Sequence, residues 1–299
     1  MLYQSSVGAI ALAVMLWSPT ADAQIFDYGK YPDFTGQWIR WGPSGPDLKG
    51  PLVRRGPTGF NGARFDPAKP NGVGQEAPLT LEYQAIFEAG QKEQSEGGQG
   101  NTPTFTCLSP GMPRATNGYG EIEFVVTPDT TYILVQHILD DRRIFTDGRD
   151  WTKELEPTFL GYSIGKWVDT DGDGRYDTLE VETRGLRGPR AYDATGLPLH
   201  RDNQSVFKER IYRDKADPNI MVNEITTIDN ALTRPWSAVK RYRRVDVKQP
   251  VWPEAVCAEG NVHVDIGGKN YFLSGDGLLM PARKDQAPPD LKYFKQPSK

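Results

Sequence analysis

The sequence predicts a mainly β protein: an antiparallel up-and-down barrel, preceded by an irregular N-terminal arm and one α-helix. β-Branched and aromatic runs follow one another from residue 121 to residue 244, with short turns between them and one amphipathic segment before them. Eight or so such strands close into a barrel or pack as a sandwich. Polar and apolar side chains mix on both faces of the strands at 204–213 and 220–229, which favours a barrel with a partly polar interior.

The first 23 residues have the features of a signal peptide. An apolar run from Val7 to Trp17 precedes the small-x-small site that ends at Ala23, although Lys and Arg are missing before the run. The alternative is a membrane anchor, but the run is short for a span. We therefore expect cleavage after Ala23, no membrane span in the mature chain, and a periplasmic or secreted protein.

Residues 24–119 form the predicted arm. The arm is rich in Gly and Pro and has little periodicity before residue 78, apart from QWIRW, a candidate first barrel strand within 36–41. Thr80, as a candidate N-cap, and an imperfect apolar face after it predict a helix at about 79–94.

The barrel is predicted at residues 120–275, and the Pro- and Lys-rich tail at 276–299. Turn-forming pairs such as Pro-Asp separate the strands, and a last strand pair is expected in NVHVDI and NYFLS. The other strands are expected at 121–126, 131–138, 142–146, 161–168, 177–185, 204–213, 220–229 and 237–244.

Charge and motifs exclude several classes of function. The net charge of -4 indicates no nucleic-acid partner. No G-x-S-x-G, Walker or dinucleotide-binding motif is present, so we expect no organic cofactor. The two cysteines, Cys107 and Cys257, favour a disulfide in an exported chain, and that compartment disfavours a cysteine nucleophile or metal site.

The stretch DTDGDGRYDTLE at 169–180 has the carboxylate spacing of a calcium-binding loop, with Gly174 at its bend. Its flanks are strands, so it is no helix-loop-helix hand, and a solvated acidic hairpin is the alternative. We expect a structural Ca²⁺ site. The candidate ligands are the carboxylates of Asp169, Asp171, Asp173, Asp177 and Glu180 and the backbone carbonyl of Arg175.

A polar cluster, RRIFTDGRDW at 142–151, ends one predicted strand. Arg143 or Arg149 is a candidate clamp for a carboxylate or phenolate in the barrel mouth. The alternative is a salt-bridged turn that fixes the strand register.

Two histidines are candidates for acid–base chemistry, because imidazole titrates near neutral pH. We expect His137, His200, Arg143 and Glu209 as a catalytic set, unless His137 is a core residue and His200 a surface loop residue. No zinc-binding spacing is present. If the barrel is hollow, some aromatic side chains line an apolar pocket with a few polar anchors. The expected substrate-binding residues are Arg149, Tyr162, Arg210, Tyr212 and Glu224.

Several motifs together resemble a widespread family of uncharacterised secreted bacterial proteins, over roughly residues 80–260. The resemblance supports pairing of the two cysteines. It also implies that the aspartate-rich hairpin is an insertion, because relatives run through a tight Gly-Asp-Thr turn there. The motifs are CLSPGMPR (107–114), RRIFTDGR (142–149), PTFLGYSIGKW (157–167), LTRPW (232–236) and Cys257.

The Gly36-x-Trp38 signature and the strand meander look like lipocalin and other calycin barrels. That resemblance implies a tryptophan at the barrel floor beneath an arginine of the last strand, which is Arg241, Arg243 or Arg244 here.

The sequence favours an exported barrel that binds a small apolar or aromatic molecule, with cofactor-independent lyase or isomerase chemistry as the catalytic hypothesis. The alternatives are a carrier without turnover and a structural envelope protein with a filled barrel.

Overall fold

The computed structural model describes ten stretches of the chain. The expected signal peptide, most of the Gly- and Pro-rich arm (42–76), His137 and the last eleven residues, 289–299, lie outside the described residues. The described stretches are 26–41, 77–96, 98–117, 120–136, 140–193, 195–257, 263–267, 269–273, 278–283 and 285–288.

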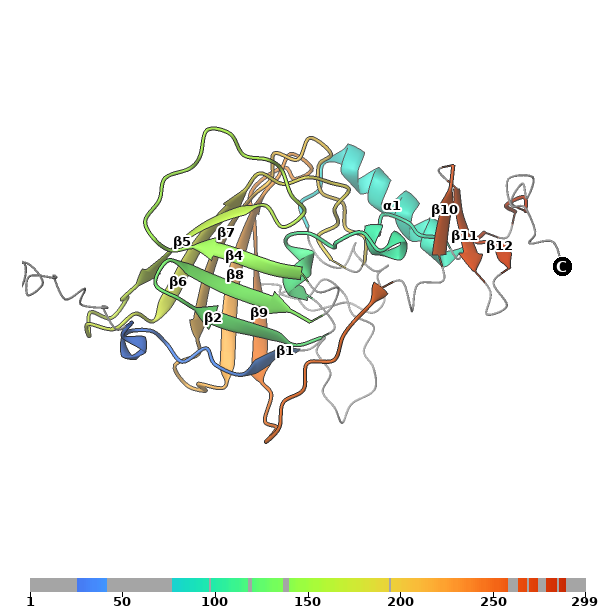
Figure 1. Cartoon of the computed structure of the whole chain (residues 1–299). Coiled ribbons are helices and arrows are strands. Elements are labelled where there is room, and N and C mark those ends of the chain that lie inside the picture. Colours follow the sequence, from blue (N-terminus) through green and yellow to red (C-terminus); the bar gives the residue numbers. More distant parts are fainter. Residues whose placement is uncertain are drawn as a thin grey trace, which may run out of the picture.

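Nine strands form a closed barrel, in which sequence neighbours pair with each other and the first strand pairs with the ninth (Figure 1). The predicted mainly β fold and its barrel are therefore confirmed, and QWIRW is the first strand. The strands are β1 (Gln37–Trp41), β2 (Ile122–Val126), β3 (Thr130–Val135), β4 (Asp140–Phe145), β5 (Tyr162–Val168), β6 (Thr178–Arg184), β7 (Val206–Arg213), β8 (Ile220–Ile228) and β9 (Trp236–Arg244).

One pair of neighbours, β4 and β5, is parallel, and all the other neighbouring strands of the barrel are antiparallel. An odd number of strands cannot alternate in direction all the way around a ring, and nine strands therefore need one parallel pair. The connection at 146–161 leaves the end of β4 and re-enters the sheet beside it, because the ring of Tyr162 at the start of β5 lies 5.0 Å from the ring of Phe145 at the end of β4 (Figure 1).

The barrel floor is closed by the segment before β1, which begins with the short 3-10 helix η1 (Tyr28–Lys30). Trp38 is fully buried, and its indole Nε1 donates to the carbonyl of Phe34 at 2.9 Å. The guanidinium of Arg244 lies 4.7 Å from the centre of the Trp38 ring. Its Nη1 also pairs with Asp33 Oδ2 at 2.9 Å. Arg244 is thus the arginine expected over the floor tryptophan.

The opposite end, the barrel mouth, is covered by two segments that we call the mouth loops, residues 107–117 and 186–200. The first contains the 3-10 helix η4 (Arg114–Asn117). Apolar side chains of both loops pack against the mouth ends of β7, β8 and β9, and Phe87 of the helix joins them. The main members of this cluster are Phe87, Met112, Leu186, Tyr192, Leu197, Phe207, Ile225 and Trp236.

The helix α1 (Leu81–Ser95) confirms the predicted helix, and the Thr80 hydroxyl accepts a hydrogen bond from its first turn as expected. The 3-10 helix η3 (Pro103–Thr106) follows it. No helix among the described residues is long and apolar enough to cross a membrane.

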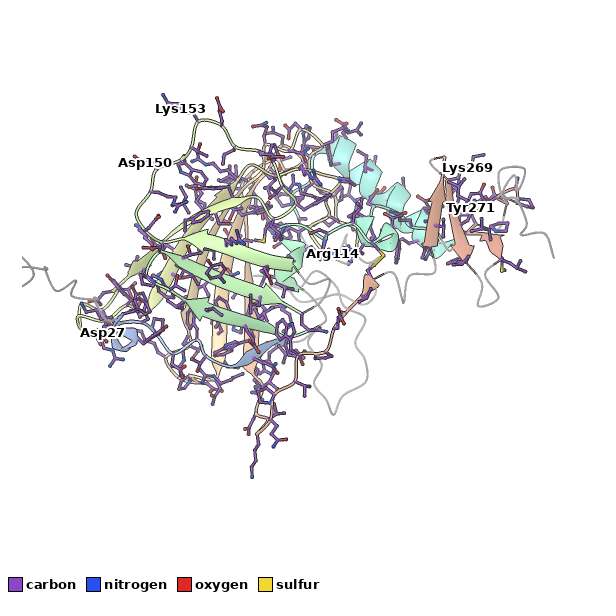
Figure 2. All side chains as sticks on the ribbon, in the orientation of Figure 1. Asp27, Arg114, Asp150, Lys153, Lys269 and Tyr271 are labelled. Carbon is purple, nitrogen blue, oxygen red and sulfur yellow. A yellow bond between two sulfur atoms is a disulfide. The ribbon has the colours of Figure 1, made fainter. Side chains whose placement is uncertain are left out.

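Beyond α1 lies a separate sheet of β10 (His263–Ile266), β11 (Lys269–Leu273) and β12 (Leu279–Pro281) (Figure 1). The barrel strands therefore end at Arg244 and do not reach residue 275, because pairing of β1 with β9 leaves no open edge for β10. A disulfide joins Cys107 to Cys257, with their Cα atoms 5.6 Å apart, and Figure 2 draws it as a yellow bond.

Candidate functional site

The centre of the barrel holds a buried ion pair between Arg142 of β4 and Glu209 of β7, whose side chains are 1 % and 0 % exposed. Arg142 also donates to the hydroxyls of Ser163 and Thr183, and Asn223 donates to Glu209 at 2.8 Å. Burial raises the pKa of Glu209, but the charge and hydrogen bonds of Arg142, with that of Asn223, outweigh burial and hold the pKa below its usual range. The cluster crosslinks five barrel strands, β4 to β8.

A second buried cation, Lys240 of β9, connects this cluster to the mouth loops. Its Nζ donates to the carbonyl of Pro113 at 3.1 Å and to the hydroxyl of Thr116 at 3.2 Å. Burial lowers the pKa of Lys240 to about 7, against the opposing attraction of Glu209. The central interior is therefore occupied by strand side chains and by contacts from the mouth loops.

Apart from His137, which lies outside the described residues, the expected catalytic and substrate-binding residues do not meet in the barrel. Glu209 points inward, whereas Arg143 lies exposed on the outer face, and its neighbour Arg142 is the arginine that reaches the interior. Arg210, Tyr212 and Glu224 also lie on the outer face. There Glu224 accepts a hydrogen bond from the Tyr212 hydroxyl at 2.8 Å and one from Arg210 at 3.3 Å.

Arg149 lies in a polar turn outside the barrel, next to Tyr162, the first residue of β5. Arg149 pairs with Asp147, stacks on Phe145 at 3.8 Å and donates to the Tyr162 hydroxyl at 3.3 Å. The hydrogen bonds from Arg149 lower the pKa of Asp147. This geometry is that of the salt-bridged turn, the alternative to a ligand clamp.

A pocket of about 520 Å³ lies beside the barrel mouth, between α1, the loop at 99–103 and the second mouth loop with the residues after it. Its size is within the usual range of small-molecule sites. The described residues that line it are Tyr83, Ile86, Gln99, Gly100, Asn101, Pro103, Gly188, Pro189, Arg190, Pro198, Leu199, His200, Arg201 and Asn203.

Of the expected catalytic residues that the structure describes, His200 alone lines this pocket. Its ring lies 5.0 Å from the ring of Tyr83, and its Nδ1 lies 2.9 Å from Asp202 Oδ1. The backbone N–H of His200 donates to Asp229 at 2.9 Å. Because Asp202 occupies the Nδ1 side, Nε2 is the ring nitrogen left for a ligand. The arrangement can position the imidazole for proton transfer.

Arg190 lines the same pocket and is 6 % exposed. Its Nη2 donates to the Ser205 hydroxyl at 2.8 Å, and Ser205 in turn donates to the Asp229 carboxylate. Its Nε and Nη1 are buried and have no hydrogen-bond partner among the described residues. Burial lowers the pKa of Arg190, against the attraction of Asp229 and Asp202.

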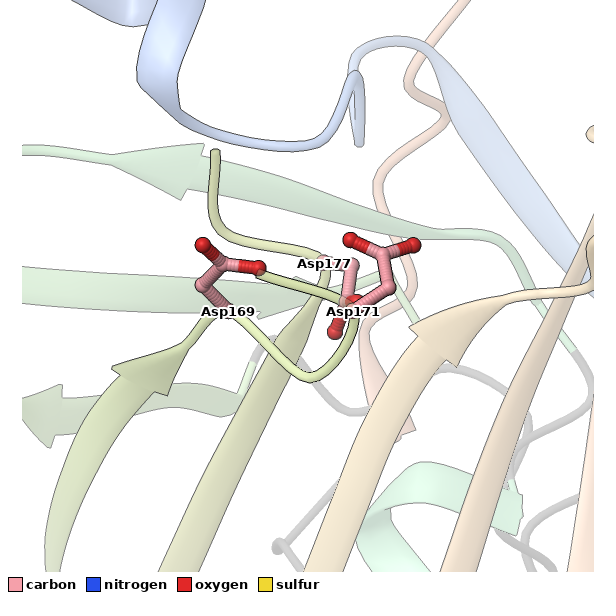
Figure 3. Close-up of side chains that lie close together, drawn as sticks. All are labelled: Asp169, Asp171 and Asp177. Carbon is pink, nitrogen blue, oxygen red and sulfur yellow. The ribbon is translucent and has the colours of Figure 1, made fainter. Parts of the chain in front are cut away.

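At the opposite end of the barrel, the hairpin between β5 and β6 brings three carboxylates together. Oxygen atoms of Asp169, Asp171 and Asp177 lie within 4.8 Å of one another, and Figure 3 shows the three side chains converging. The N–H groups of Gly172 and Gly174 donate to Asp169. This cluster can hold a metal ion.

Two of the other expected calcium ligands, the carboxylates of Asp173 and Glu180, are not part of this cluster. Asp173 accepts a hydrogen bond from the backbone N–H of Arg175 at 2.8 Å. Glu180 lies on the outer face of β6, where it pairs with Lys166 at 3.1 Å and Arg210 at 3.7 Å.

The pocket and the central cluster contain residues that the sequence did not point to: Arg190, Arg142, Asn223 and Lys240. Alternation could have identified Arg142, since it shares a face with the apolar Ile144 two residues later. Arg190 had no such signal, because it lies in a loop without periodicity and meets α1 only through the tertiary fold.

Comparisons of the chain with protein-family models, with curated proteins and with solved structures gave no match. The resemblance to a family of secreted bacterial proteins therefore remains a prediction from its motifs. The closed nine-stranded barrel, with Arg244 over Trp38, is compatible with a lipocalin-like fold.

Proposed function

We propose that this protein is exported, to the periplasm or outside the cell, and binds a small molecule with an apolar or aromatic body in the pocket beside the barrel mouth. One observation carries the proposal. A pocket of about 520 Å³ combines the apolar surfaces of Tyr83, Ile86 and Leu199 with a few polar side chains. The Cys107–Cys257 disulfide supports the location, because disulfides persist in oxidising compartments.

The pocket is a better candidate than the barrel interior. A β-barrel is compatible with small-molecule binding, but the centre of this one is occupied by the ion pair of Arg142 and Glu209. A ligand there would have to displace hydrogen bonds of buried charged groups, which costs several kcal/mol (about 3–5 for breaking a buried pair). In the pocket, a ligand would replace water against apolar side chains.

Calorimetric titration with the neutral aromatic alcohol 2-naphthalenemethanol tests the site. Ile86→Trp places an indole in the pocket and should weaken binding at least about tenfold, because the indole takes the space of the ligand. Leu81→Trp is the matched control, since Leu81 lies on the same helix, is 91 % exposed and does not line the pocket. Equal binding by the two variants, or no binding of naphthalene compounds by the wild-type protein, would exclude this pocket as the binding site.

Acid–base catalysis of the lyase or isomerase type is a second candidate function, favoured by Asp202 beside His200. Native mass spectrometry of the protein isolated from a periplasmic extract would identify a bound compound. The wild-type protein should convert that compound into a product, and His200→Gln should leave it intact. A compound that the wild-type protein returns unchanged indicates a carrier.

We further propose that Asp169, Asp171 and Asp177 hold a metal ion, that this ion is Ca²⁺, and that its role is structural. Ca²⁺ prefers several oxygen ligands, and the spacing of the carboxylates in DTDGDGRYDTLE is that of calcium loops. The site would fasten the β5–β6 hairpin to the floor segment, because the Tyr176 N–H donates to the Lys30 carbonyl at 2.7 Å.

Thermal melts test the calcium proposal. Millimolar Ca²⁺ should raise Tm by about 2–4 °C over a sample in EGTA, as expected for a site with a Kd near about 0.1 mM. Asp171→Asn should abolish the difference. Asp150→Asn removes an exposed carboxylate outside the cluster and should retain it. If the wild-type protein has the same Tm in Ca²⁺, Mg²⁺ and EGTA, the calcium proposal is wrong and the hairpin is an acidic turn without a bound ion.

A further inference from the structure

The charged side chains that line the mouth pocket are of one sign, although Asp202 pairs with His200 and, with Asp229, attracts Arg190. Arg190 and Arg201 line it together with His200, and no carboxylate is among its described lining residues. The Ser205 hydroxyl bridges Arg190 to the carboxylate of Asp229. The pocket therefore offers hydrogen-bond donors and positive charge beside an apolar wall.

Arg190 makes fewer hydrogen bonds than a buried guanidinium needs. It has five N–H groups, and a fully buried charge is stable in a protein only when it is paired and hydrogen-bonded. Yet Nε and Nη1 have no partner in the described part of the chain, and the Ser205 contact uses Nη2 alone. A guanidinium in this state is poised to accept an anion, since its planar edge matches the two oxygens of a carboxylate.

The lining opposite the charge suits an aromatic ring. The rings of Tyr83 and His200 lie 5.0 Å apart and tilted against each other, and Leu199 and the prolines complete an apolar surface. We propose that the ligand of this pocket is an aromatic carboxylate, whose carboxylate pairs with Arg190 while its ring packs beside Tyr83. This inference rests on the proposed function and names the chemical class of its ligand.

A pair of probes of equal shape tests the inference. 2-Naphthoate and 2-naphthalenemethanol share one ring system, and only the first carries a negative charge. By calorimetry, the wild-type protein should bind 2-naphthoate at least about tenfold more tightly, as expected for one hydrogen-bonded charge pair. Added salt should narrow the difference, because it screens the pair.

Arg190→Met keeps the length of the side chain and removes its charge. It should reduce the affinity for 2-naphthoate about tenfold and change that for the neutral probe by less than about threefold. Arg187→Met is the matched control, because Arg187 lies three residues earlier, stacks on Phe159 and does not line the pocket. It should leave both affinities unchanged.

The outcomes separate the two proposals. Equal affinity of the wild-type protein for the two probes would overturn the carboxylate inference and leave the pocket proposal standing. If the wild-type protein binds neither probe, the pocket proposal itself is overturned. A preference for 2-naphthoate that persists in folded Arg190→Met would show that another cation holds the anion. The wild-type comparison needs no substitution, so the test stands even if Arg190→Met fails to fold.

Discussion

At the scale of the residue, a lysine in the middle of a β-barrel has an energetic cost. Lys240 is 0 % exposed, and its amine must leave water to donate to Pro113 and Thr116 of a mouth loop. Burial disfavours the charged form, which lowers its pKa to about 7 from the ordinary 10.5. Between these two values the unfolded chain holds a proton that the folded protein has released.

The stability of the protein should therefore rise with pH across this window. The Lys240 contribution to the free energy of unfolding increases by about 1.4 kcal/mol for each pH unit between the folded and unfolded pKa values. Urea unfolding at pH 7, 8 and 9 should show this slope in the wild type and its loss in Lys240→Met. Lys208→Met, on the exposed face of β7, should keep the wild-type slope. If the free energy of unfolding changes with pH in the same way for the wild type and Lys240→Met, the lowered pKa of Lys240 is contradicted.

Which face of a strand a residue occupies was only partly predictable. In β4 the alternation of Arg142 and Ile144 places arginine inside, against the general preference of charged residues for water. That preference predicts both adjacent arginines on the outside, and only the alternation with Ile144 favours Arg142 for the interior. Its partner there, Glu209, lies 67 residues away in sequence.

At the scale of the element, the contact between β4 and β5 depends on a glycine. Gly165 faces Ile144, and a Cβ at this position would lie 2.6 Å from Ile144 Cγ2 and 3.2 Å from the Glu180 carbonyl. Real atoms do not approach so closely, so the strands would have to separate or Ile144 would have to leave its rotamer. The ladder between β4 and β5 has two register pairs and is shorter than the ladders on either side of it, β3–β4 and β5–β6.

Gly165→Ala should therefore destabilise the barrel, by about 1–3 kcal/mol in urea unfolding, the usual range for overpacking. The control is Lys166→Ala, the next residue of the same strand. It lies on the exposed face in a surface ion pair with Glu180, and its loss should cost less than about 1 kcal/mol. A Gly165→Ala protein as stable as Lys166→Ala would mean that β5 can shift outward freely.

The elements were more predictable than their arrangement. Strand periodicity marked every barrel strand, and Thr80 marked the start of α1, because these signals are local. The need for a parallel pair follows from counting strands, but connection length does not locate it, because the connection at 185–205 is longer than the one at 146–161 and joins antiparallel strands. The pocket had no local signal, since residues of α1 meet residues 188–203 only after the barrel has formed.

At the scale of the whole molecule, the disulfide encloses most of the fold. Cys107 and Cys257 are separated by 150 residues, and eight of the nine barrel strands lie between them. Closing so long a loop restricts the unfolded chain far more than the folded one. The bond also ties the segment that leads toward β10 to the first mouth loop.

Removal of the disulfide should lower the free energy of unfolding by about 5 kcal/mol on the chain-entropy model. The comparison is urea unfolding of the wild type and of Cys107→Ser/Cys257→Ser, both without reductant. Addition of reductant serves as the control, because it should bring the wild type to the double variant and leave the variant itself unchanged. An unfolding midpoint shared by the two proteins under oxidising conditions would contradict a stabilising role.

The same bond has a mechanical consequence. Of the barrel strands, only β1 lies outside the loop that the disulfide closes. A pulling force applied to the two chain ends would pass from Cys107 to Cys257 through the sulfur atoms, so β2 to β9 would carry no tension. The first barrel element to yield would be β1, peeled away from β9 and from its short ladder with β2. Stretching would then open the barrel along a single seam and extend the chain by little until the disulfide was reduced.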